Sequence, residues 1–207
     1  GASFNDLGSY ALLAFQATLY ERVFHMPASQ YAPLLAVALP IGGAIGGLSG
    51  GLLADSAEAT GRRAWATVGA TAAAAPAMAA AVLAPDGSTS LVVGAVGYML
   101  AEAWRAPATN MARSCAAPDA GASAVGLYLC IRNCVGGLGP LAVVALAQAL
   151  GGNLRVAMLL VPAAYGASAL AFAAAEAEFK KEQLATAAAL VRSKVSGDAT
   201  SGGRTQG

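Results

Sequence analysis

The chain has 207 residues, of which 57% are hydrophobic and only 11% are charged. Soluble domains carry about 25% charged residues, and the mean hydropathy here is +0.60, so the composition excludes an ordinary soluble protein and predicts a membrane protein. The net charge is +1, and the sequence has no basic cluster with interleaved aromatic residues, which gives no support for a nucleic-acid partner.

Six apolar stretches of near-spanning length follow one another along the chain. A helix needs about 20 apolar residues to cross a bilayer, so we predict an all-α, polytopic bundle over residues 1–176. The remaining residues, 177–207, are predicted to be a tail that is helical at first and then disordered. The predicted transmembrane helices are residues 5–23, 31–54, 64–83, 91–112, 123–150 and 155–175.

Glycine pairs mark the second predicted helix, and a further glycine cluster lies in the fifth. A spacing of four residues places the pairs on one helix face, where the missing side chains let a second helix approach closely in lipid. We interpret both groups as packing residues rather than as a binding site, with a helix break or bend expected at the proline. They are Gly42, Gly43, Gly46, Gly47, Gly50, Gly136, Gly137, Gly139 and Pro140.

An acid and a basic turn follow the second predicted helix. Asp55 stands at the predicted carboxyl end of that helix, where the helix dipole disfavours a negative charge, so it favours a partner. One interpretation is a contact that holds a single conformation of the protein. The other is a solvated boundary acid, with Arg62 and Arg63 as membrane anchors.

Charged residues inside the fourth and fifth predicted helices are the strongest candidates for function. Glu102 and Arg105 are three residues apart and therefore share a face, and Arg132 lies in the next predicted helix. Charges at such depth are costly unless they are paired or line a wet cavity. Glu102 is either a proton-coupling acid or the structural partner of an arginine. The candidate pathway residues are Glu102, Arg105, Arg132, Gln16, Asn110 and Asn133.

The distribution of basic residues predicts the orientation of the chain. If the chain enters the first helix from the cytoplasm, Arg62, Arg63, Arg113 and the basic residues of the tail fall on the cytoplasmic side. Only Arg22 and Arg155 then fall on the opposite side, in agreement with the positive-inside rule. A cytoplasmic carboxyl terminus is therefore expected, in a membrane that no address signal identifies.

Three motifs together resemble a known family. Gly51-Leu-Leu-Ala-Asp55 followed by Gly61-Arg62-Arg63 resembles the loop signature of the major facilitator superfamily. The block Ala101-Glu-Ala-Trp-Arg-Ala-Pro107, with the later 122–129 and 133–140 segments, is similar to its spinster-like branch. The segment Leu19-Tyr-Glu21-Arg22-Val23 also resembles the start of the second half of such transporters.

This resemblance implies a fragment: the carboxyl-terminal six-helix half of a twelve-helix transporter, which lacks its amino-terminal partner half. It also implies alternating access around a central cavity, with the lipid bilayer and a small or lipid-like solute as partners. The loop residues Gly51, Asp55, Gly61, Arg62 and Arg63 would form a conformational gate. The expected function is secondary active transport, with proton coupling through Glu102 as a further hypothesis.

Two alternatives remain beside transport. A half-length membrane scaffold or regulatory partner is distinguished by the genomic sequence upstream of Gly1, since six more apolar stretches there favour a transporter. A membrane enzyme is not supported, because the sequence has no HExxH, no GxSxG and no histidine cluster. We predict no cofactor and no metal site, since the only histidine, His25, is far from the three cysteines.

Overall fold

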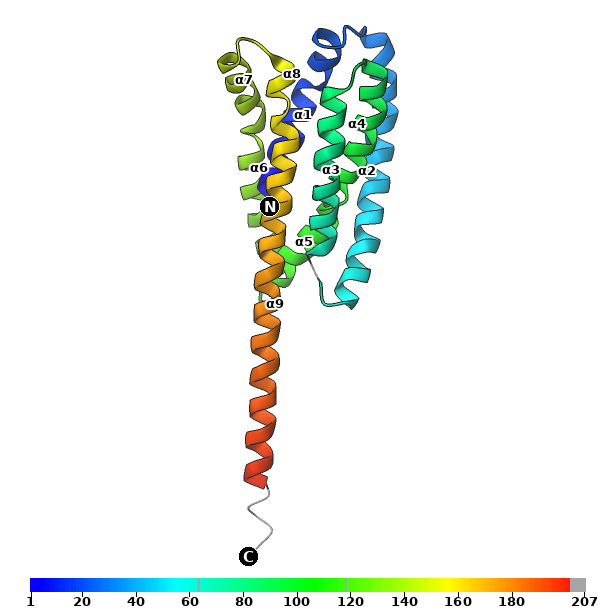
Figure 1. The fold of residues 1–207 in the computed structure, drawn as a ribbon. Helices are drawn as coiled ribbons and strands as arrows, with labels where there is room; N and C mark the ends of the chain where they lie inside the picture. The colour runs from blue at the N-terminus through cyan, green and yellow to red at the C-terminus, as the bar shows by residue number, and fades with distance from the viewer. Residues whose placement is uncertain (63, 118, 202–207) are drawn as a thin grey trace, which may run out of the picture.

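The computed structural model describes residues 1–62, 64–117 and 119–201, and within them all regular structure is α-helical. The helices run side by side as a bundle, and α9 extends well beyond it toward the carboxyl terminus (Figure 1). Their bounds are α1 (Ala2–Arg22), α2 (Ala28–Ala59), α3 (Trp65–Leu83), α4 (Gly87–Glu102), α5 (Arg105–Ser114), α6 (Gly121–Gly136), α7 (Gly139–Ala149), α8 (Leu154–Ala157) and α9 (Leu160–Ser201).

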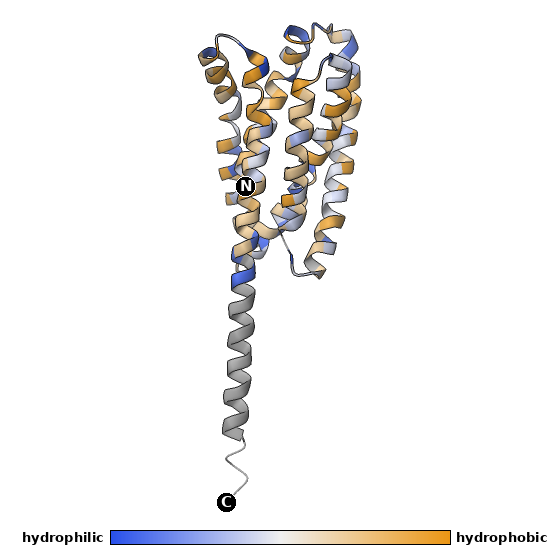
Figure 2. Ribbon diagram, in the orientation of Figure 1, coloured by the Kyte–Doolittle hydropathy of each residue, from blue (hydrophilic) through white to orange (hydrophobic). Residues whose placement is uncertain are grey.

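Four helical segments of the described chain are long and apolar enough to cross a membrane. They are Ala28–Ala57, Trp65–Leu83, Gly121–Ala149 and Leu154–Glu178. Apolar residues predominate over the bundle (Figure 2). The predicted all-α membrane fold is therefore confirmed, whereas the count of six transmembrane helices stays a prediction.

Three of the predicted transmembrane helices are divided in two. Each break begins three or four residues before a proline: Pro107, Pro140 or Pro162. A proline ring clashes with the carbonyl group four residues earlier, but it is well tolerated in the first turn of a helix. The sequence leads us to expect the break at Pro140. Within the predicted span 91–112, α4 ends at Glu102 and α5 begins at Arg105, a break before Pro107 that the sequence analysis does not predict.

Two helices are longer than the sequence predicts. The α2 helix continues past the predicted end at 54 as far as Ala59, so Asp55 lies inside it. The α9 helix continues without a break from Leu160 through the predicted helical part of the tail as far as Ser201. Residues 176–194 are rich in alanine, glutamate, lysine and leucine, which favour helix, and no proline or paired glycine interrupts them.

The hydrophobic core joins α1, α3 and α9. Ala11 and Leu19 of α1 pack with Met78 of α3 and with Val161 and Tyr165 of α9, all of them buried. The α2 helix lies on the outside of this core, against α4 and α5.

Only one glycine of each pair on α2 lies in the contact with α4. An added Cβ would overlap the carbonyl oxygen of Met99 at Gly46 and that of Ala103 at Gly50, and at Gly42 it would lie 3.3 Å from Tyr98. Nothing lies within 4 Å of the same position at Gly43, Gly47 or Gly51. The packing role predicted for Gly43 and Gly47 is therefore not seen in the described bundle.

The second glycine cluster packs on α1. An added Cβ would lie 2.8 Å from Asp6 Cβ at Gly136 and would overlap the carbonyl oxygen of Leu7 at Gly139. Gly137 faces only carbonyl groups of its own segment. Pro140 lies at the start of α7, so its role is to begin that helix beside the contact.

Arg155 fixes the carboxyl end of α3. Its Nε donates to the carbonyl oxygen of Val82 at 2.9 Å, and its Nη2 donates to that of Ala84. The guanidinium also lies 5.1 Å from the ring centroid of Phe24. One side chain therefore ties the end of α3 to α8 and to the turn after α1.

Arg155→Ala is expected to lower the free energy of unfolding by about 1.5–3 kcal/mol, the range for hydrogen bonds to a charged group. The measurement is thermal unfolding in detergent micelles. Arg22→Ala is the matched control, because Arg22 is an exposed basic residue in the last turn of α1. Equal melting temperatures for the two variants would contradict this assignment.

At the start of α4, Asp86 caps the helix. Its Oδ1 accepts a hydrogen bond from the backbone N–H of Thr89 at 2.9 Å, and its Oδ2 accepts one from the Thr89 hydroxyl at 2.8 Å. These donors stabilise the charged carboxylate and lower the pKa of Asp86 below its ordinary value. The cap explains why α4 begins at Gly87.

Candidate functional site

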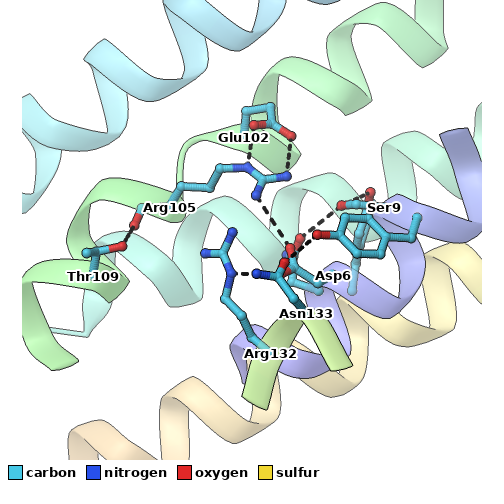
Figure 3. A network of polar contacts seen from close by, with 10 residues as sticks. Asp6, Ser9, Glu102, Arg105, Thr109, Arg132 and Asn133 are labelled. Atoms are coloured by element: carbon cyan, nitrogen blue, oxygen red, sulfur yellow. Dashed lines mark hydrogen bonds and ion pairs between the residues drawn. The ribbon is translucent and has the colours of Figure 1, made fainter. Parts of the chain in front are cut away.

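Four charged side chains from α1, α4, α5 and α6 meet in the interior of the bundle. They are Asp6, Glu102, Arg105 and Arg132, and we call them the charge cluster (Figure 3). Asp6 is completely buried, and Glu102 and Arg132 are also buried. Arg105 is the most accessible member, with 31% of its side chain exposed.

The cluster forms a chain of ion pairs. Arg105 holds Glu102 with two hydrogen bonds, Nε to Oε2 at 2.5 Å and Nη2 to Oε1 at 3.0 Å. The Nη1 of Arg105 also donates to Asp6 Oδ1 at 3.4 Å. On its other side, Asp6 Oδ2 lies 2.8 Å from Nε of Arg132. That contact is an ion pair without hydrogen-bond alignment, since neither atom has a hydrogen-bond partner among the described residues.

The charges of the cluster balance, with two carboxylates and two guanidinium groups. Buried charges are tolerated when they are paired, and removing one partner leaves the other uncompensated. Asp6 contacts both arginines, whereas Glu102 is paired with Arg105 alone. Asp6 is therefore the residue on which the pairing of Arg132 depends.

Trp104 lies beside both arginines. The Cζ atom of Arg132 is 5.2 Å from the centroid of its ring, and that of Arg105 is 5.6 Å away. These distances are within the range of cation–π attraction. Trp104 is fully buried and occupies the break between α4 and α5, so the helix break before Pro107 provides the aromatic side of the cluster.

The other predicted pathway residues lie outside the cluster. Asn133 is exposed and accepts a hydrogen bond from Tyr10 Oη. Asn110 is exposed on α5, and Gln16 is partly buried about 15 Å along α1 from Asp6 at 1.5 Å per residue. The structure thus brings together Glu102, Arg105 and Arg132 but not Gln16, Asn110 or Asn133.

Asp6 is the site residue that sequence reasoning misses. It stands at the predicted start of the first helix, where an acid is ordinarily solvated. A signal was present, because Asn5, Asp6 and Ser9 place polar groups on neighbouring positions of one helix face. In the structure Asn5 and Ser9 are buried too, and Ser9 Oγ lies 3.1 Å from Tyr165 Oη.

The predicted gate loop has a clear glycine requirement. Gly61 has φ +71, and the N–H of Arg62 donates to the carbonyl oxygen of Ala57 at 2.9 Å. This is the bonding of a Schellman cap, which places glycine in the left-handed conformation after the helix end. The Arg62 guanidinium lies 4.9 Å from the ring centroid of Trp65. Asp55 is exposed on α2, and the predicted Arg63 lies outside the described residues.

A buried acid of α9 holds the other end of this loop. The Oε2 of Glu176 accepts a hydrogen bond from the backbone N–H of Ala64 at 2.8 Å, just before α3 begins. A carboxylate at a helix amino terminus is favoured by the exposed N–H groups and the helix dipole. Glu176 therefore packs against the rest of the bundle, as the last residue of the predicted bundle region.

The apolar helices of the bundle are those of an integral membrane protein, and the charges buried in its interior are paired with one another. A solved structure of a bacterial homolog of the human lysosomal transporter Spinster, inward-facing and unoccupied, has the same fold, with a TM-score of 0.57. The match has 23% sequence identity and covers 86% of this chain and 45% of that chain. No protein-family model and no curated protein matches the chain.

The predicted resemblance to a spinster-like protein is thus confirmed at the level of the fold. The chain spans about half the length of the solved transporter that it matches.

Proposed function

We propose that this chain is one half of a secondary active transporter that moves a small or lipid-like solute by alternating access. The observation that carries the proposal is the charge cluster: four ionisable side chains held in the interior of a bundle with a transporter fold. Intramembrane charges are expensive, and they commonly mark ion or substrate pathways. Coverage of about half of the solved transporter supports the assignment to one half.

Proton coupling through the cluster follows from its shared arginine. Glu102 and Asp6 both contact Arg105, so protonation of either acid removes one of its two negative partners. Arg105 is then freer to bind an anionic group or to leave α1, which gives the protein two arrangements that differ in charge. The alternative is that the cluster has a purely structural role and only fixes the positions of the helices.

Glu102→Gln is expected to abolish the pH dependence of transport while the protein remains folded. The measurement is uptake driven by an imposed proton gradient into vesicles that contain the full-length protein. Glu178→Gln is the control, because it also removes one acid, and Glu178 is exposed on α9 in an ion pair with Lys181. If Glu102→Gln leaves the pH dependence unchanged, Glu102 is structural and the coupling hypothesis is rejected.

We propose the predicted orientation together with this function. The α2–α3 connection, the α5–α6 connection and the extension of α9 lie at one end of the bundle (Figure 1). Arg62, Lys180 and Lys181 belong to these segments, and Arg113 lies in the last turn of α5, beside the α5–α6 connection. Arg22 and Arg155 belong to segments at the other end. Under the positive-inside rule, this separation supports a cytoplasmic carboxyl terminus.

We also propose that the α2–α3 connection, together with Asp55 one turn before it, is a conformational gate. Its two ends are fixed by different elements, the cap at Gly61 by α2 and the backbone N–H of Ala64 by α9. A movement of α9 relative to α2 would therefore change the loop. A loop whose ends are fixed to two packed elements changes conformation when those elements rearrange, because packed interfaces switch between discrete arrangements.

A further inference from the structure

A cavity of about 230 Å³ lies on the outer side of the bundle, between the start of α3 and α9. Its walls are Trp65, Val68, Ala173, Glu176, Ala177 and Lys180. The α3 helix begins at Trp65, and the apolar segment of α9 ends at Glu178. Both limits fall at the same end of the bundle, so the cavity lies at the depth of lipid headgroups.

One wall of this cavity holds a carboxylate oxygen that has no donor. Glu176 is only 6% exposed. Its Oε2 is occupied by the N–H of Ala64, but Oε1 is buried and has no hydrogen-bond partner among the residues that the structure describes. A buried charged acceptor without a donor is costly, and an N–H group that reached Oε1 from the cavity would remove that cost.

The other walls of the cavity add a positive charge and an apolar surface. Lys180 follows Glu176 by one helical turn, is exposed, and lines the same cavity. Trp65 is half exposed at the rim, where aromatic residues favour the membrane interface. Val68, Ala173 and Ala177 provide the apolar lining.

We propose that this cavity binds the headgroup of a phospholipid that carries a primary amine, such as phosphatidylethanolamine. The ammonium group donates to Glu176 Oε1, the phosphate accepts from Lys180, and the acyl chains follow the apolar surface of α3 and α9. A choline headgroup has no N–H to donate, and glycerol headgroups bring no cation to Glu176. The site therefore discriminates by headgroup, and it depends only on insertion in a membrane, not on the proposed transport.

The experiment is native mass spectrometry of the full chain, released from micelles that contain equal amounts of phosphatidylethanolamine, phosphatidylcholine and phosphatidylglycerol. We expect the phosphatidylethanolamine adduct to exceed each of the others by about tenfold, the factor that one charge-assisted hydrogen bond supplies. Glu176→Gln keeps an acceptor for Ala64 N–H but loses the charge, and it should abolish this preference. Glu178→Gln, on an exposed position of the same helix, should retain it.

A cavity-filling variant provides a second test that leaves both charges in place. Ala177→Leu should also remove the preference for phosphatidylethanolamine, because the new side chain occupies the cavity. If Glu176→Gln does not fold, this variant alone tests the proposed site. Equal adduct intensities for the three lipids in the unmodified chain would overturn the proposal. So would a preference for phosphatidylethanolamine that persists in both Glu176→Gln and Ala177→Leu.

Discussion

Asp6→Asn is expected to lower the free energy of unfolding by about 3–5 kcal/mol, the cost of breaking a buried ion pair. Asp6 is completely buried, and its two oxygens contact Arg105 and Arg132. Arg105 keeps Glu102 after the substitution, but Arg132 loses its ion-pair partner within the described chain. The loss should appear as a lower midpoint in thermal unfolding in micelles.

A double substitution distinguishes charge imbalance from a simple loss of packing. Asp6→Asn with Arg132→Gln removes one charge of each sign, so the remaining Glu102 and Arg105 still balance. We expect the loss of unfolding free energy in the double variant to be smaller than the sum of the two single losses by at least about 1 kcal/mol, as for residues in direct contact. Strictly additive effects would contradict the ion pair, and so would a small cost for Asp6→Asn like that of Glu178→Gln, which breaks an exposed pair.

The fold class and part of the cluster can be predicted from the sequence. Long apolar stretches leave few alternatives to membrane helices, and Glu102, Arg105 and Arg132 stand out because they interrupt such stretches. Asp6 is missed for the opposite reason, since an acid near the end of a stretch looks like a boundary residue. Its pairing with Arg132, 126 positions along the chain, depends on how α1 and α6 are rotated toward each other, which local sequence patterns do not determine.

The glycine pairs show a second limit of local patterns. Neighbouring residues on a helix point about 100° apart because a turn has 3.6 residues, so both members of a pair cannot face one partner helix. The structure selects Gly42, Gly46 and Gly50 for the contact with α4 and α5 and leaves Gly43 and Gly47 open. The sequence predicts that a tight contact exists but not which member of each pair makes it.

Helix ends are determined by cap geometry more than by charge. The acid at Asp55 suggests the end of the second helix, whereas α2 ends at Ala59. The left-handed conformation at Gly61 and the hydrogen bond from Arg62 to Ala57 define that end. Asp55 therefore lies on the side of α2, one turn before the loop. A gate contact made by Asp55 would have to be with an element beside α2, not with one at its end.

Gly50→Ala is expected to destabilise the bundle by about 1–3 kcal/mol, the usual cost of overpacking. The new Cβ would overlap the backbone carbonyl oxygen of Ala103, which no side-chain rotation can relieve. The α2 helix must then move away from the break between α4 and α5, next to Trp104 and Arg105. The substitution should therefore disturb the charge cluster although Gly50 touches none of its members.

Gly51→Ala is the matched control, because it makes the same chemical change on the next residue of α2, where nothing lies within 4 Å. Alanine is the better helix former by up to about 1 kcal/mol, so Gly51→Ala should leave stability unchanged or raise it. Thermal unfolding gives the difference between the two variants, and tryptophan fluorescence should shift only for Gly50→Ala, through Trp104. If both variants stabilise the protein to the same extent, α2 does not pack against α4 and α5 through the face that carries Gly50.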